Sequence, residues 1–284
     1  MKIGIGLPNQ VRDVRPSVIP AWAAAAETAG FSTLSTIGRV AYPGVMDTVA
    51  LAAAAGATSR IGLLSGIMLA PVWPGALLAK EAAGIDGVSG GRLTLGIAAG
   101  IRPDDFVADG YSPAGRGKRF DRDLEVYRDV WQGKPVGGGP NPAVPAGTRE
   151  VPLLFGAVAP VAFARMARWG QGFIGGSFPP EMVAGSFDSA RDAWREAGRR
   201  GSPRLVALAY FGLGDTEQGR RNVHDYYSIA GDEIAGTVVS GFCDSAQAVR
   251  EVVKAYEDLG VDELLLNPGL DDPNEVSRLA EIAL

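Results

Sequence analysis

The sequence has one cysteine, Cys243, and one histidine, His224, among its 284 residues. A single cysteine excludes an internal disulfide and is typical of the reducing cytoplasm. A metal centre needs several His, Cys or carboxylate ligands at suitable spacing, so we predict no metal site. Ser-His or Cys-His nucleophiles depend on His224, which lies in the polar segment RRNVHDYY and is expected to be structural or on the surface. We therefore expect an enzyme of this composition to take its chemistry from a cofactor.

Long apolar runs and an excess of positive charge are also missing. The run from Ile61 to Trp73 is shorter than the ~18 residues of a membrane span, so we predict no membrane partner. The formal net charge of -5 argues against a polyanion-binding surface, and we predict no nucleic-acid partner. The basic stretch 115–122 leads into an amphipathic helix and is interpreted as a solvated face. No secretory signal is expected, so we predict a cytoplasmic location.

What the sequence does contain is a regular alternation of strands and helices. Most strand candidates are short apolar runs without polar alternation, which is typical of parallel strands buried on both faces. The pattern predicts an α/β fold, a single (β/α)8 TIM barrel over residues 1–284, rather than an open sheet. The strand candidates are Lys2–Leu7, Thr33–Ile37, Ile61–Leu69, Arg92–Ile97, Val151–Ala157, Gly172–Gly175, Arg204–Phe211 and Asp262–Leu266.

The sequence also predicts the local structure of three further segments. Residues 133–150 are rich in Gly and Pro and predict a loop, with a domain linker as the alternative. Asp215–Thr237 predicts a helical insertion after the seventh strand. It would cover the site as a lid or pack only on the flank of the barrel. Asp47 is expected to cap the alanine-rich helix that runs to Ala57.

Glycine-rich turns follow several predicted strands, at the end of a barrel where ligands are held. The turn Gly96–Gly100 is interpreted as a phosphate loop or as a plain tight turn. Ser65-Gly66-Ile67 interrupts the third strand, which marks either a ligand-approach bulge or a packing glycine. Gly156–Pro160 precedes a helix whose amino end suits a phosphate, and Gly175-Gly176 leaves room beside it.

Three polar residues near strand ends are candidates for catalysis, although each also has a structural interpretation. Arg39 would hold an anionic group or form a surface ion pair. Asp105, in the run Pro103–Asp105, would line the barrel mouth or stabilise the start of a helix. Asn9 follows the first strand. No residue is assigned as the catalytic acid or base.

Five segments in the same order resemble bacterial luciferase-like monooxygenases. They are LLAKEAAGIDGVSGGRLTLGIAAG, RPDDFVADG, RGKRFDRDLEVYRDVW, PLLFGAVAPVAFARMARWGQGFIGG and AQAVREVVKAYEDLGVDELLL. The resemblance implies a TIM barrel that binds FMN or coenzyme F420, a homodimer through helices near the second and third strands, and a cis peptide bond at Gly66-Ile67. It implies a phosphate site at the amides around Val158–Phe163 and Gly175–Gly176. The implied cofactor-binding residues are Ser65, Gly66, Ile67, Ala99, Gly100, Gly156, Ala157, Val158, Gly175 and Gly176.

The sequence also departs from that family. Ala99, Ala159 and Ala162 stand where luciferase holds the FMN phosphate with an arginine and hydroxyl groups. Arg39 ends the segment where the F420-dependent alcohol and sugar dehydrogenases carry a histidine. These departures favour an oxidoreductase that uses a reduced cofactor, F420 slightly ahead of FMN, to reduce or monooxygenate a small organic substrate. The alternatives are a non-catalytic flavin-binding barrel and a non-redox lyase or isomerase.

Overall fold

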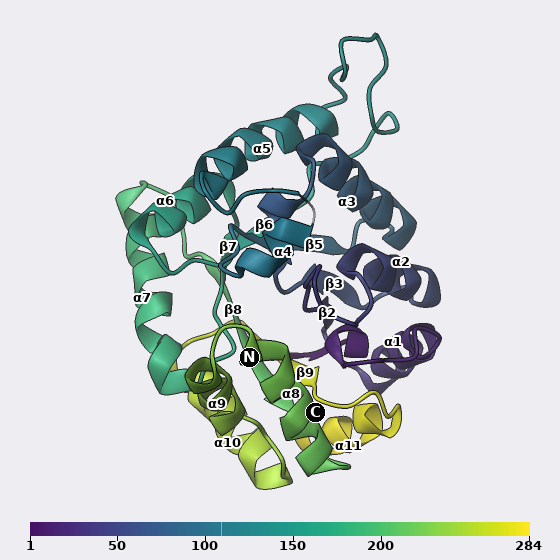
Figure 1. Cartoon of the computed structure of the whole chain (residues 1–284), viewed down its shortest axis with the longest axis vertical. Helices are drawn as coiled ribbons and strands as arrows, with labels where there is room; N and C mark the ends of the chain where they lie inside the picture. The colour runs from purple at the N-terminus through teal and green to yellow at the C-terminus, as the bar shows by residue number, and fades with distance from the viewer. Residues whose placement is uncertain (109) are drawn as a thin grey trace.

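A closed barrel of parallel strands forms the centre of the computed structural model, which describes residues 1–108 and 110–284 (Figure 1). The order β3-β2-β1-β9-β8-β7-β6-β5-β4 closes because β5 also pairs with β3. β3 and β4 are two parts of one barrel strand, so nine strands fill eight positions. The strands are β1 Lys2–Gly6, β2 Thr33–Thr36, β3 Gly62–Ser65, β4 Met68–Leu69, β5 Leu93–Ala98, β6 Leu153–Phe155, β7 Gly172–Ile174, β8 Arg204–Phe211 and β9 Glu263–Pro268.

This arrangement confirms the predicted TIM barrel. The main difference lies in the third barrel strand, predicted as one run over Ile61–Leu69. It is interrupted after Ser65, where the peptide bond between Gly66 and Ile67 is cis, as predicted.

Helices surround the barrel and follow its strands in turn (Figure 1). They are α1 Val18–Ala29, α2 Asp47–Ala57, α3 Gly75–Ser89, α4 Pro103–Ala108, α5 Arg116–Trp131, α6 Pro160–Trp169, α7 Pro180–Glu196, α8 Thr216–Ser228, α9 Asp232–Ser240, α10 Ala246–Asp258 and α11 Asn274–Ala283. Two short 3-10 helices, Pro8–Gln10 and Ala70–Val72, complete the set of described helices. Among the described residues, none of these helices has the length and apolar character needed to cross a bilayer.

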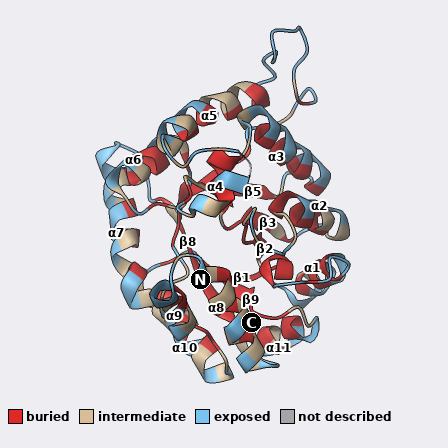
Figure 2. Cartoon of the chain, in the orientation of Figure 1, coloured by how far each residue is buried: buried red, intermediate tan, exposed pale blue. Residues whose placement is uncertain are grey.

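The apolar core has two parts. Inside the barrel, six buried side chains pack together: Leu64, Leu154, Ile174, Val206, Leu208 and Leu265. A larger cluster fills the space between the strands and the inner faces of the helices. Figure 2 shows this pattern, with buried residues on the strands and on the barrel-facing sides of the helices. A strand buried on both faces reads as a continuous apolar run, which is why the strands were recognisable.

The segments with special composition take distinct positions. Residues 133–150 join α5 to β6 and project from the barrel as a loop, as predicted (Figure 1). The insertion after the seventh barrel strand consists of α8 and α9. The expected cap at Asp47 is wrong: α2 begins at Asp47, its cap position is Met46, and no side chain caps it. The Asp47 side chain is instead buried against Gly38.

Candidate functional site

A cavity of about 450 Å³ opens at the carboxyl ends of the barrel strands. Segments that follow β2, β3, β5, β6 and β7 line it, together with α8. Its size and its mostly apolar lining are typical of small-molecule sites. In a TIM barrel this end of the strands is where active sites are built.

The floor of the cavity is built from residues with little or no side chain. Gly66 and Ile67 form one part of it, and Ala98, Ala99 and Gly100 form another. Gly100 has φ of +75°, a left-handed conformation that favours glycine. The result is a floor of backbone, methyl groups and the Ile67 side chain, which carries no charged or polar side chain.

Two close approaches fix this floor. A Cβ atom at Gly96 would lie 1.9 Å from the carbonyl oxygen of Ser65, so β3 and β5 touch through their backbones there. The Ser65 hydroxyl donates a hydrogen bond to the Gly96 carbonyl oxygen at 2.8 Å. A Cβ atom at Gly156 would lie 2.5 Å from the Ile67 Cδ1 atom. Glycine at these two positions therefore lets the third strand lean into the barrel mouth.

The predicted cofactor-binding residues mostly meet at this cavity. Eight of the ten line it: Gly66, Ile67, Ala99, Gly100, Gly156, Ala157, Val158 and Gly176. Ser65 is fully buried beneath the floor. Gly175 packs against the ring of Phe187, where a Cβ atom would lie 2.9 Å from the ring. Their role in binding a cofactor stays a prediction.

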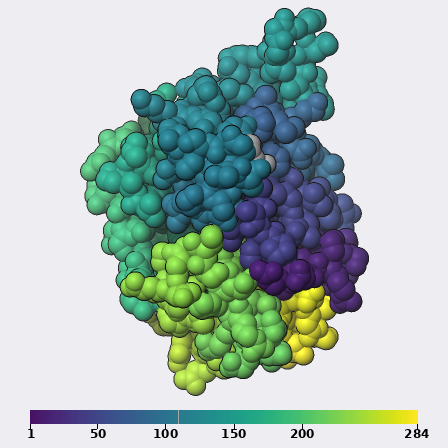
Figure 3. Space-filling view, viewed as in Figure 1, coloured from purple at the N-terminus to yellow at the C-terminus, as the bar shows by residue number. Residues whose placement is uncertain are grey.

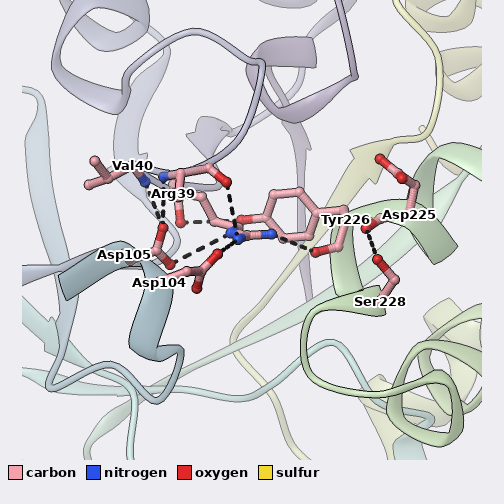
Figure 4. Close-up of polar contacts among 9 residues, drawn as sticks. Arg39, Val40, Asp104, Asp105, Asp225, Tyr226 and Ser228 are labelled. Atoms are coloured by element: carbon pink, nitrogen blue, oxygen red, sulfur yellow. Dashed lines mark hydrogen bonds and ion pairs between the residues drawn. The ribbon is translucent and has the colours of Figure 1, made fainter. Parts of the chain in front are cut away.

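Arg39 forms the ion pair that was one of its two expected roles, but the pair is enclosed and does not lie on the surface. Its side chain is only 4% exposed and forms ion pairs with Asp104 and with Asp105, the latter at 3.6 Å between Nε and Oδ2. The guanidinium also lies over the rings of Tyr42 and Tyr226. Figure 4 shows Arg39 between the two aspartates of α4 and Tyr226 of α8. Its charge is therefore compensated inside the protein.

The other two catalytic candidates, Asp105 and Asn9, form hydrogen bonds with backbone groups of the segment that follows β2. Asp105 is fully buried and accepts hydrogen bonds from the amides of Val40 and Ala41 at 2.9 and 3.0 Å (Figure 4). The Asn9 side-chain amide donates to the carbonyl oxygens of Ile37 and Val45. Arg39, Asn9 and Asp105 thus lie behind the cavity wall formed by Ile37 and Gly38. Helix α4 begins at Pro103, as its structural interpretation predicts.

Helix α8 forms one wall of the cavity, so its packing is not confined to the flank of the barrel. Tyr226 and Tyr227 line the cavity, and the Tyr226 hydroxyl donates to the Gly38 carbonyl oxygen at 3.2 Å. Figure 3 shows the green surface of α8 and α9 beside the blue surface of the segment that carries α4. Burial raises the pKa of Tyr226 and of Tyr210 above the usual value, so both hydroxyls stay protonated at neutral pH.

Three arginines line the cavity, and the sequence interpretation singled out none of them. Arg116 donates through Nε to the Gly100 carbonyl oxygen at 2.8 Å. Arg165 pairs with Asp121 through two hydrogen bonds of 2.6 and 3.1 Å. Arg102 lies over the rings of Tyr226 and Tyr227, with its guanidinium carbon 5.1 and 5.2 Å from their centroids. Among the described residues that line the cavity there is no carboxylate.

The remaining reactive side chains lie outside this cavity. Cys243 is buried, and burial raises the pKa of its thiol to about 12, so it is not a nucleophile at neutral pH. His224 is on α8 but does not line the cavity. No group of three or more His, Cys, Asp or Glu residues suited to a metal ion occurs in the described part of the chain.

Comparison with known proteins assigns the chain to a family. The family model described as "Luciferase-like monooxygenase" matches residues 1–235. The chain belongs to the luciferase-like monooxygenase family. An uncharacterized protein of Mycobacterium tuberculosis is 30% identical over 189 residues, a match that spans 56% of this chain and 66% of that protein.

Solved structures of luciferase-like enzymes share the fold. Monooxygenase RslO1 from Streptomyces bottropensis is 24% identical with a TM-score of 0.76, and the match covers 100% of this chain and 98% of that one. An F420-dependent secondary alcohol dehydrogenase, solved with an F420-acetone adduct, is 16% identical with a TM-score of 0.79, at 99% and 97% coverage. The oxygenating constituent of 3,6-diketocamphane monooxygenase from Pseudomonas putida, solved with FMN, is 15% identical with a TM-score of 0.73, at 99% and 95% coverage.

The cavity of this luciferase-like chain has features that fit a flavin or deazaflavin. The floor around Gly66 and Ile67 is apolar, and the glycines that line it leave room for a ring to approach the backbone. Ala99, Ala159 and Ala162 all line the cavity, so the luciferase phosphate anchors are missing at those positions. Arg116 of α5 supplies positive charge instead, whereas the charge of Arg165 of α6 is compensated by Asp121.

Fewer backbone amides of Val158–Phe163 are free for a phosphate than predicted. The amides of Ala162 and Phe163 both donate to the Ala159 carbonyl oxygen, at 2.8 and 3.3 Å, and are not free for a phosphate. Arg116 and Arg165 are the cationic side chains that line the cavity from α5 and α6. Their positions in the motifs RGKRFDR and ARMARW were visible, but nothing in the spacing showed that two different helices bring them to one cavity.

Proposed function

We propose that this protein is an oxidoreductase that uses reduced FMN or reduced coenzyme F420 on a small organic substrate. The observation that carries the proposal is the cavity itself. Its floor is apolar at Gly66-Ile67 and Ala98–Gly100, and its charged lining residues are arginines. Such a cavity suits a planar ring with an anionic tail.

The apolar floor and Arg116 would bind different parts of the cofactor. Gly66, Ile67 and Gly156 would contact the face of the ring, since their small or apolar groups present no competing side chain. Arg116 would bind the phosphate that both cofactors carry, because its guanidinium is held by carbonyl oxygens and has no carboxylate partner among the described residues. The amino end of α6 adds favourable electrostatic potential for the same anion.

The bound cofactor would supply reducing equivalents, as hydride from F420 or as oxygen-reactive electrons from FMN. The protein's own residues would orient the partners and exclude water. The apolar floor and the α8 wall, which includes Tyr226 and Tyr227, carry out the exclusion. Of the two cofactors we favour F420, because Ala99, Ala159 and Ala162 lack the groups that hold the FMN phosphate in luciferase.

The test is a fluorescence titration of the cofactor-free protein with FMN and with F420. We expect saturable binding of at least one, with F420 the tighter. Gly156→Val should weaken binding about tenfold or more, because its side chain pushes Ile67 into the cavity. Gly185→Ala on α7 is the matched control, since a Cβ atom there meets nothing within 4 Å.

The outcomes separate the alternatives. Tighter binding of FMN would overturn the cofactor preference alone. Binding without turnover of any substrate by the reduced cofactor would support a non-catalytic flavin-binding barrel. Binding of neither cofactor would reject the proposal and favour a non-redox lyase or isomerase.

A further inference from the structure

Arg102 is a cation in the cavity without a counter-ion. It lies between β5 and α4 and lines the cavity beside α8. Among the described residues, no hydrogen bond or ion pair is made by its guanidinium, and its Nε atom is buried without a partner. Such a group is costly for the protein to keep unless something else binds it.

The carboxylates nearest to Arg102 in the sequence are already occupied. Asp104 and Asp105 both pair with Arg39, and Asp105 also accepts two backbone amides. The charge of Arg39 is therefore compensated behind the wall, whereas the charge of Arg102 is not. The faces of Tyr226 and Tyr227 stabilise the Arg102 guanidinium only by cation–π contact.

The surroundings of Arg102 suggest what its partner would be. The cavity that it lines also has apolar and aromatic side chains, including Ile37, Phe178 and Leu208, and no carboxylate of the described chain. An arginine at the edge of an apolar space is suited to a carboxylate on an apolar body, since its planar fork binds both oxygens at once. Arg165, by contrast, has protein partners. Its Nη2 atom donates to the carbonyl oxygen of Gly117 in α5.

The geometry points to a substrate that carries a carboxylate on an aromatic or aliphatic body, with Arg102 as the residue that binds the carboxylate. This assignment rests on the proposed function, in which Arg116 binds the cofactor phosphate. It gives Arg116 of α5 to the cofactor, and Arg102, which lies over the two tyrosines of α8, to the substrate.

The test compares two probes of equal shape, 2-naphthoate and its uncharged counterpart 2-naphthamide. Their affinities are measured by calorimetry on protein saturated with the cofactor that binds. We expect wild type to bind 2-naphthoate about tenfold more tightly than 2-naphthamide. Arg102→Met should reduce that preference to about twofold or less. Arg102→Lys should retain an intermediate preference, because it keeps the charge and loses the fork.

Arg116→Met serves as the crossed variant. It should weaken cofactor binding and leave the ratio of the two probes unchanged, whereas Arg102→Met should do the opposite. A ratio that survives in Arg102→Met would overturn the assignment. So would a loss of cofactor affinity in Arg102→Met with the ratio intact, because Arg102 would then serve the cofactor.

Failure of the proposed function would be seen separately, as absence of cofactor binding to wild type. The probe ratio is then measured on the cofactor-free protein, where loss of the naphthoate preference in Arg102→Met still supports the assignment. If Arg102→Met does not fold, the same two probes are measured on Arg102→Lys and Arg102→Gln. The lysine variant should then keep a preference for 2-naphthoate, and the glutamine variant should lose it.

Discussion

Asp47 is a buried carboxyl group beneath the glycine that ends the second strand. Its side chain is 1% exposed, and its Oδ1 atom has no hydrogen-bond partner among the described residues. A Cβ atom at Gly38 would lie 1.9 Å from Asp47 Oδ2, so a side chain at position 38 would displace the Asp47 carboxyl group. Burial raises the pKa of Asp47 from 3.8 to about 6.

Asp47→Asn should therefore stabilise the protein above pH 6. The folded state binds the Asp47 proton more tightly than the unfolded chain does, so wild-type stability falls as the pH rises from about 4 to about 6. Asparagine keeps the shape and does not titrate. We expect a gain of up to about 3 kcal/mol at pH 8 and none below pH 4. Urea unfolding at both pH values measures it, and a loss of stability at pH 8 would contradict the burial argument.

Individual side chains were the hardest part to predict. Arg39 and Arg102 both follow strand ends, and composition alone made Arg39 the natural anion-binding candidate. Only the fold shows that Asp104 and Asp105, 65 and 66 residues further on, pair with Arg39 and leave Arg102 in the cavity. The choice between two cations depended on long-range contacts, which one sequence does not reveal.

At the scale of elements, the barrel mouth is held by a contact among three segments. The loop after β2, helix α4 and helix α8 meet at Arg39, through the two aspartates and Tyr226 (Figure 4). Tyr42 of that loop also donates to Asp225 of α8 at 2.7 Å. These contacts fix the wall that α8 contributes.

Arg39→Met should be strongly destabilising. It leaves the carboxylates of Asp104 and Asp105 without their cation inside the protein, a change that costs about 3–5 kcal/mol in buried pairs. Arg102→Met removes a cation with only aromatic contacts and should cost about 1 kcal/mol or less. Urea unfolding of both variants gives the comparison. Equal losses would show that the Arg39 ion pairs do not hold the mouth together.

Helices and strands were predicted well where the local sequence determines them. Apolar runs gave all eight barrel strands, and Pro103 with two acidic residues marked the start of α4. The cap at Asp47 was mistaken because capping was inferred from residue type, whereas packing against Gly38 takes the carboxylate away from the helix end. The same limit applies to α8, whose polar sequence did not show that two tyrosines line the cavity.

At the scale of the whole molecule, the barrel carries exposed apolar side chains on neighbouring helices. Val49 of α2 and Leu77 and Val88 of α3 are 59%, 46% and 65% exposed, and α2 packs against α3. A contiguous patch of exposed apolar side chains is typical of an interaction surface, and these three lie on two helices that pack together. The family resemblance implied a dimer through helices near strands two and three, which includes these two.

The protein is therefore expected to be a homodimer in solution, with about twice the mass of one chain by light scattering. Leu77→Lys combined with Val88→Lys should shift it to the monomer, because charged groups would be buried at the contact. Met182→Lys on α7, where Met182 is 58% exposed, is the matched control and should leave the dimer intact. A wild-type monomer, or a dimer that survives the double change, would reject this interface.

The backbone contact between Gly96 and Ser65 also makes position 96 a marker in other sequences. Any side chain at Gly96 would collide with the Ser65 carbonyl oxygen. The residue type at position 96 therefore indicates the path of the third strand, about thirty residues earlier in the sequence. A related chain with a larger residue there must carry its third strand further from the fifth. Its cavity floor would then have a different shape, however similar the rest of the sequence.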